Sequence, residues 1–218
     1  MNNKDWLAAL TGLAFLVLVI VGFVIAGEPP DPSEDSIQEI IDFYDDNVDS
    51  VWIGSIIQVI AGTALVFFGG YMRKVLRAAE GEGHMLSAVA LAGATILAIA
   101  AAIDATINIA LAEAVDNVDD LEPATVQALS VLWSNDFLPL ALGGTVFMLA
   151  VGISIVRHGA LPKWLGWVAI LFGVAGMTPV GFFAFIGAGL WIGGVSILLS
   201  LRARAASQAP PAPQAPPA

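Results

Sequence analysis

The sequence has no cysteine and few charged residues, and each absence removes a class of protein. Without cysteine the chain forms no disulfide, thiolate metal site or cysteine nucleophile. Charged residues make up 12% of the 218 residues, about half of the roughly 25% found in globular domains. Eight Lys and Arg against 19 Asp and Glu give a formal charge of −11, which argues against a nucleic-acid-binding surface.

Motifs for common chemistries are also missing. The sequence has no phosphate-binding loop, no glycine-rich dinucleotide motif, no zinc-protease motif and no serine-hydrolase elbow. No pair of broken helices of the kind found in many secondary transporters stands out. We therefore assign no catalytic residue, no metal ligand and no cofactor from the sequence.

Apolar residues dominate what is present. They form 58% of the chain, and the mean hydropathy is +0.84. A water-soluble fold of this size could not bury so much apolar surface, so we expect a lipid bilayer to surround much of the chain. The pattern predicts an all-α membrane domain over residues 1–204 with six transmembrane helices at about 6–27, 51–72, 85–112, 137–156, 164–178 and 181–201.

Two of these segments admit a second interpretation. The uncharged run 6–27 could be a secretory signal peptide, but signal cores are usually only about 7–15 apolar residues long. The uncharged stretch 164–201 is too long for one crossing and suits two, with a turn at Thr178-Pro179-Val180-Gly181. The alternative there is a kinked, partly re-entrant element and five full crossings. The Ala- and Pro-rich segment 205–218 is predicted to be a disordered tail.

Two long polar loops separate the spans, and each is predicted to hold a short helix. In the first, Ile37, Ile40, Ile41 and Tyr44 follow the i, i+3, i+4, i+7 spacing of an amphipathic helix. Ser33 or Asp35 would cap that helix. A second short helix is expected at about 126–133.

Charge orients the six-span map. All eight Lys and Arg residues fall on one predicted side, and the positive-inside rule makes that side cytoplasmic, together with both termini. Of the 19 acidic residues, 15 fall in the two long loops on the other side. We expect these acidic outer loops to be the surface that meets a protein partner, although a solvated acidic surface alone is the simpler interpretation. They lack the glycine and terminal glutamate of a calcium-binding EF-hand loop.

Asp104 is the one ionisable residue well inside a predicted span, so it is the main candidate for a polar intramembrane site. Asn108 lies one helical turn further on the same face. The functional interpretation is a proton or cation site, and the structural one is an interfacial cap or packing group near the end of the span. Gln58 on the second span is a further polar candidate, better explained as a packing group that hydrogen-bonds between helices.

Small residues mark candidate helix-packing sites. Gly189 and Gly193 have the GxxxG spacing on the sixth span, and Ala169 and Gly173 have the equivalent spacing on the fifth. We expect them to pack helices within one chain rather than to form a dimer. His84 and His158, the two histidines, fall in predicted loops and are interpreted as solvated side chains.

Two stretches resemble an uncharacterised group of multi-pass membrane proteins from actinobacteria. They are residues 76–90, from Leu-Arg-Ala-Ala-Glu-Gly-Glu-Gly onwards, and Leu161-Pro162-Lys163-Trp164-Leu165-Gly166-Trp167. Members of the group typically show arginine where this chain has Lys163, so the charge is kept. The resemblance covers about 33–201 and implies a bacterial plasma membrane and the same helical layout, but it transfers no functional residue.

These observations lead to a main functional hypothesis and two alternatives. The main one is a non-enzymatic six-helix protein that acts as an accessory, scaffold or envelope-stress component. The first alternative is a small transporter or channel with Asp104 and Asn108 beside an aqueous path. An intramembrane enzyme is the weakest, because no nucleophile is paired with a base.

Overall fold

The computed structural model describes residues 5–83 and 85–208, apart from the side chain of Glu82. In this part of the chain all regular secondary structure is helical. His84 and most of the predicted tail lie outside the described residues. Helix α8 continues to Gln208, so its last four residues belong to the predicted tail.

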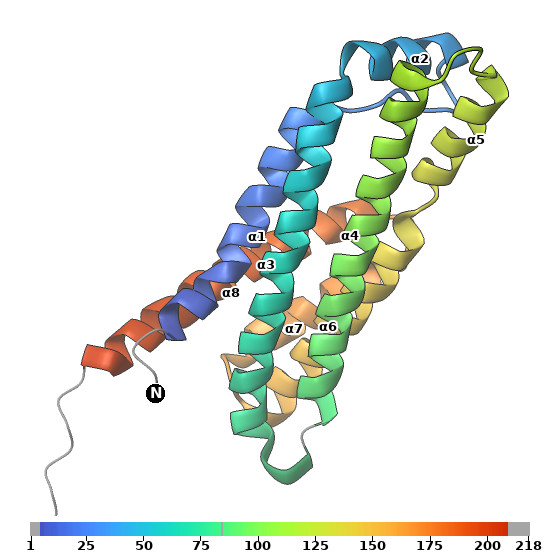
Figure 1. The fold of residues 1–218 in the computed structure, drawn as a ribbon. Coiled ribbons are helices and arrows are strands. Elements are labelled where there is room, and N and C mark those ends of the chain that lie inside the picture. Colours follow the sequence, from blue (N-terminus) through green and yellow to red (C-terminus); the bar gives the residue numbers. More distant parts are fainter. Residues whose placement is uncertain (1–4, 84, 209–218) are drawn as a thin grey trace, which may run out of the picture.

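Four long helices form the body of the molecule (Figure 1). They are α1 (Asp5–Ala26), α3 (Val48–Glu80), α4 (Met85–Asn117) and α6 (Phe137–His158). In sequence order each packs antiparallel to the next, and the short 3-10 turn η1 (Gly81–Gly83) joins α3 to α4. Helices α3 and α4 have 33 residues each, about 50 Å at 1.5 Å per residue. They are therefore longer than the predicted spans and longer than the roughly 30 Å bilayer core.

Glycines allow the closest approaches between these helices. A side chain at Gly54 of α3 would meet Ala26 at the end of α1 at 2.7 Å. A side chain at Gly152 of α6 would come within 2.7 Å of the Gly166 carbonyl oxygen on α7 (Lys163–Ala175). Because real Cβ atoms do not approach so closely, backbones at these points can touch only where glycine is present.

Two short helices cover one end of the bundle, which we call the cap end. They are α2 (Ile37–Asp46) and α5 (Pro123–Ser134), seen at the top of Figure 1. The N-cap of α2 is Ser36, so the predicted caps Ser33 and Asp35 are wrong. Asp35 instead accepts a hydrogen bond from the Asp31 backbone N–H at 2.7 Å, in the turn before the helix.

Ser36 and Glu39 form a capping box at the start of α2. The Glu39 backbone N–H donates to Ser36 Oγ at 3.3 Å, and the Ser36 backbone N–H donates to Glu39 Oε2 at 2.8 Å. The hydrogen bonds from the Ser36 backbone and hydroxyl lower the pKa of Glu39. Both ends of the capping box therefore hold the first turn of α2 in place.

Helices α7 and α8 (Gly181–Gln208) form a hairpin whose turn lies opposite the middle of α6. Thr145 Oγ1 on α6 donates to the Gly173 carbonyl near the end of α7 at 2.9 Å. The Phe185 ring, in the first turns of α8, packs 3.0 Å from the position of a Cβ at Gly144. From this turn α8 runs diagonally back toward the start of α1 (Figure 1).

Within residues 5–83 and 85–208, five helical stretches are long and apolar enough to cross a membrane. They are α1, α3, α4, α8 and the stretch Pro123–His158 that contains α5 and α6. The predicted fifth span, 164–178, corresponds to α7, whose 13 residues reach only about 20 Å. The predicted count of six transmembrane helices is therefore not confirmed.

The apolar interior is divided into two clusters. The larger one lies among the four long helices, α7 and α8, and includes Phe68, Met72 and Phe147, all fully buried. The smaller one lies at the cap end and joins α2, α3, α4 and α5 through Ile40, Tyr44, Val51, Leu111, Ala112 and Val126. The cap end is thus a packed unit with a core of its own.

Candidate functional site: a polar layer beneath the cap

A group of polar side chains lies where the cap helices meet the long helices. We call it the polar layer, and it consists of Tyr44, Asp104, Asn108, Ser130, Trp133 and Asp136. Asp104 and Asn108 lie one turn apart on α4, and Asn108 Nδ2 donates to the Asp104 carbonyl at 3.3 Å. The structure therefore brings together the two residues predicted from the sequence.

Two long-range hydrogen bonds join this part of α4 to the cap helices. Trp133 Nε1, at the end of α5, donates to Asp104 Oδ1 at 3.0 Å. The Tyr44 hydroxyl of α2 donates to Asn108 Oδ1 at 3.0 Å. Both acceptors lie on one face of α4, so a single face of this helix holds both cap helices.

Tyr44 is suited to be a permanent donor in this arrangement. Its side chain is 1% exposed and belongs to the cap core. Burial, and secondarily the nearby Asp104 carboxylate, raise the pKa of Tyr44. The hydroxyl therefore keeps its proton at all physiological pH values and continues to donate to Asn108.

Two atoms of the polar layer have no hydrogen-bond partner within the described part of the chain. They are Ser130 Oγ on α5 and Asp136 Oδ2 in the turn between α5 and α6. Ser130 is 3% exposed, and Asp136 is close enough to Asp104 for their carboxylates to repel each other. An unpaired buried polar atom costs free energy, so a hydrogen-bond partner for Ser130 Oγ, or a proton on Asp136 Oδ2, would lower the free energy of the polar layer.

The depth of Asp104 follows from helix contacts. Helix α1 ends at Ala26, which packs against Gly54, and Gly62 packs against Ala98 of α4. Because α3 and α4 are antiparallel, moving eight residues from Gly62 to Gly54 corresponds to moving from Ala98 to position 106. Asp104 thus lies only about 3 Å below the level at which α1 ends. This position favours the structural interpretation, a packing group near the end of the span.

The other predicted polar candidate lies elsewhere. The side chain of Gln58 packs on α1, with its Cγ 2.9 Å from the position of a Cβ at Gly22. The Gln58 side chain forms no hydrogen bond with another residue of the described part of the chain. The structure thus joins Asp104 to Asn108 and leaves Gln58 as a packing residue between α1 and α3.

The small-residue pairs pack helices within the chain. Gly193 faces the Leu16 side chain of α1, 2.6 Å from the position of a Cβ, and Gly189 faces the same leucine at 3.4 Å. Ala169 is fully buried in the main core, and Gly173 packs against Leu149 of α6. Both predicted motifs therefore bring α7 or α8 against a neighbouring helix.

Two surface hollows lie at the opposite end of the bundle, and no residue of the polar layer lines either of them. One is lined by five residues of α3, and the other lies between η1 and the end of α6, where His158 lines it. Among the described residues no three His, Asp or Glu side chains come together as a metal-binding group.

Sequence reasoning missed the partners of Asp104 and Asn108. Trp133 lies at the end of the second predicted loop helix, and the spacing of the first loop helix places Tyr44 on its apolar face. The partners lie 29 and 64 residues away along the chain, so no local spacing could pair them. One feature of the sequence could have indicated these contacts. Each predicted loop helix ends near an aromatic residue that carries a hydrogen-bond donor.

No protein-family model, no curated protein and no solved structure matches this chain.

Proposed function

We propose that the chain is a non-enzymatic multi-pass membrane protein that presents a rigid acidic surface to a protein partner. The surface consists of residues 28–50 and 113–136, which we call the acidic cap. The observation that carries this proposal is that the cap has its own core and is tied to α4 by two side-chain hydrogen bonds. Loops that only connect helices need neither a core of their own nor hydrogen bonds that fix them to another helix.

The proposed topology has four complete crossings and one re-entrant hairpin. Helices α1, α3, α4 and α6 cross fully, while α7 enters to mid-depth and α8 returns to the side from which α7 entered. This arrangement keeps all eight Lys and Arg residues on one side, which the positive-inside rule makes cytoplasmic. Both termini are then cytoplasmic and the acidic cap faces outward. The assignment to a bacterial plasma membrane rests on the resemblance described above.

The charge of the acidic cap defines the kind of partner. Of its 15 acidic residues, 14 are exposed, and the cap contains no Lys or Arg. A surface of one sign steers a partner of the opposite sign and raises the association rate. A packed cap also loses little conformational freedom on binding. We therefore infer a protein partner with a basic surface and an affinity that falls with salt.

The test uses two triple variants that remove equal charge from two parts of the acidic cap. One neutralises Asp42, Asp45 and Asp46 on α2, and the other neutralises Asp116, Asp119 and Asp120 in the last turn of α4 and just after it. A carboxyl-to-amine cross-linker applied to intact membranes should join the wild-type chain to one defined protein. One triple variant should lose that product while the other keeps it. No defined product, or equal losses in both variants, would refute a specific docking surface.

A proton- or cation-conducting role is the second candidate. It is favoured by Asp136 Oδ2 and Ser130 Oγ, two buried atoms of the polar layer that have no hydrogen-bond partner among the described residues. In reconstituted vesicles, Asp104→Asn and Asp136→Asn should then each abolish flux of protons or monovalent cations while leaving the chain folded. Flux that is absent in the wild-type protein, or unchanged in both variants, excludes this role.

A further inference from the structure

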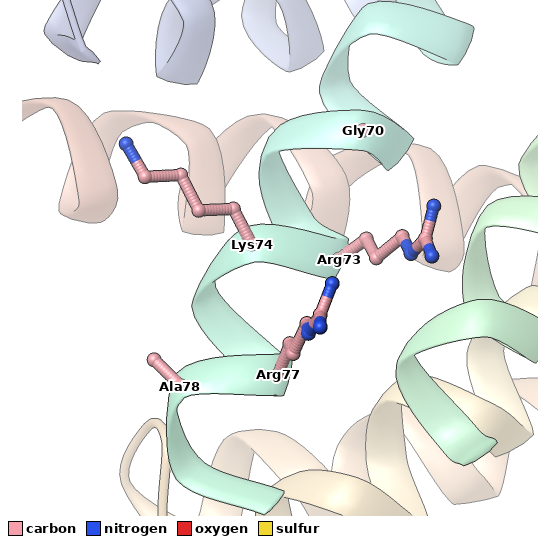
Figure 2. A pocket seen from close by; sticks show the side chains of 5 residues that line it. All are labelled: Gly70, Arg73, Lys74, Arg77 and Ala78. Atoms are coloured by element: carbon pink, nitrogen blue, oxygen red, sulfur yellow. The ribbon is translucent and has the colours of Figure 1, made fainter. Parts of the chain in front are cut away.

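A second feature lies at the opposite end of the bundle, on α3. An open groove there is lined by Gly70, Arg73, Lys74, Arg77 and Ala78 (Figure 2). Three of these five residues are cationic, and the charges occupy two successive helical turns. The position of a Cβ on Gly70 has no other atom within 4 Å, so the groove is open beside the helix backbone.

The cations in the groove differ in what they already bind. Lys74 Nζ forms an ion pair with Asp5 Oδ2 of α1 at 2.8 Å. Within the described part of the chain, Arg73 and Arg77 have no ion-pair partner. They are four residues apart, so their guanidinium groups project from the same side of α3, as Figure 2 shows. Two adjacent guanidinium groups match the geometry of a phosphate group.

The groove lies at the level where the apolar part of α1 begins. The Lys74–Asp5 ion pair fixes this level, because the uncharged run of α1 starts at Trp6. Nearby, the Arg204 guanidinium of α8 lies 4.1 Å from the Trp6 ring centroid. Tryptophan and basic residues gather at the headgroup level of membranes, so the two arginines are at the depth of lipid phosphates.

Apolar surface continues from the groove toward the centre of the bundle. Phe67, one turn before Gly70, is 67% exposed. Exposed Phe67, the bare backbone at Gly70 and the arginines therefore follow one another along the same side of α3. This order of apolar surface followed by positive charge matches a phospholipid with its chain toward the bilayer centre and its phosphate at the surface.

We propose that the groove binds one anionic phospholipid, with its phosphate between Arg73 and Arg77 and an acyl chain beside Gly70 and Phe67. The inference rests on the proposed insertion in a bilayer. A lipid fits better than a soluble anion because the groove combines charge with exposed apolar surface at the membrane boundary. Lys74, already neutralised by Asp5, contributes less than either arginine.

The experiment measures lipid binding to the purified full chain by native mass spectrometry. The probes are phosphatidylglycerol, phosphatidylcholine and inorganic phosphate. Phosphatidylglycerol should bind more tightly than phosphatidylcholine, and inorganic phosphate should not displace it. At about 1 kcal/mol per basic residue near a membrane surface, Arg73→Gln/Arg77→Gln should weaken phosphatidylglycerol binding roughly 30-fold.

The matched control is Arg157→Gln/Lys163→Gln, which removes two positive charges from the same end of the bundle outside this groove. Its phosphatidylglycerol affinity should stay within about two-fold of wild type. Equal affinity for both lipids, or equal weakening in both double variants, overturns the site. A separate arm asks whether the chain stays in vesicles after a carbonate wash. If the wash removes the chain from the vesicles, membrane insertion itself is refuted. If the chain stays but binds phosphatidylglycerol no more tightly than phosphatidylcholine, only the lipid site is refuted.

Discussion

Replacing Trp133 by phenylalanine tests whether the polar layer holds the acidic cap on the bundle. The substitution keeps an aromatic ring at the end of α5 but removes the Nε1–H that donates to Asp104 at 3.0 Å. Asp104 would then keep a partly buried carboxylate oxygen without its donor. We therefore expect the cap to loosen while the main core among the long helices stays intact.

The magnitude follows from the type of hydrogen bond that is lost. A hydrogen bond to a charged group contributes about 1.5–3 kcal/mol. For a chain of this length, 1 kcal/mol shifts Tm by about 2–4 °C, so Trp133→Phe should lower Tm by about 3–12 °C. Tyr44→Phe removes a bond between neutral groups, and its cost should be only about 1 kcal/mol.

The assay is thermal unfolding of the detergent-solubilised chain, followed by circular dichroism at the helix band. Trp164→Phe is the matched control, because Trp164 lies on α7 and is 64% exposed. Its Tm should match wild type. Hydrogen exchange should locate the effect of Trp133→Phe in α5 and leave the amides of α6 beyond its first turns unchanged.

A double-mutant cycle decides whether the two side chains act as a pair. Asp104→Leu alone leaves the Trp133 N–H unpaired, whereas combining it with Trp133→Phe leaves two apolar groups facing each other. The double variant should therefore be more stable than the sum of the two single losses predicts. Additive losses, or a Trp133→Phe chain as stable as wild type, would refute the pairing.

Three further predictions test other parts of the structure. A cysteine introduced at Thr178, in an otherwise cysteine-free chain, should be protected from membrane-impermeant maleimide on both sides; labelling from the cap side would instead indicate six full crossings. Gly12→Val should destabilise the chain by about 1–3 kcal/mol, because its Cβ would lie 2.6 Å from a buried phenylalanine ring. Gly70→Ala is the control and should be tolerated. Equal unfolding midpoints for the two variants would contradict this packing. Ser36→Ala should cost about 1 kcal/mol and speed hydrogen exchange in the first turn of α2; unchanged exchange would show that the capping box contributes nothing.

Hydropathy predicted the sequence bounds of the long helices but not how the helices pack against one another. Asp5–Ala26 and Phe137–His158 agree with the predicted spans to within a few residues, because their charge-free runs have sharp ends. The segment 164–201 was predicted as two crossings from its length and from the proline and glycine of the turn at 178–181. Its turn lies opposite Gly144 and Thr145 because small residues there let α7 and α8 pack against the middle of α6. Such a contact has no signature in the hydropathy of either segment.

The sequence also predicted the local part of the polar layer but not its long-range contacts. Asp104 and Asn108 could be placed on one face of a helix because their spacing of four residues fixes it. Trp133 and Tyr44 could not be assigned to them, because the contact depends on how α2 and α5 fold back over α4. The cap of α2 was misplaced for a related reason. Several Ser and Asp residues precede the helix, and which one caps it depends on the turn that Asp31 and Asp35 form.

The position of the polar layer has a physical explanation in the lengths of the helices. Helices α3 and α4 are about 50 Å long, so they extend well beyond a bilayer core of about 30 Å. Beyond the end of α1, their neighbours change from an apolar helix to the cap helices, and in the proposed topology the surroundings change there from lipid to water. At that boundary a hydrogen bond such as Trp133–Asp104 fixes the register of α5 against α4, which apolar contacts alone do not specify. A register shift of one residue would turn Trp133 away from Asp104, so the polar layer favours a single arrangement of the cap, as a partner-binding surface requires.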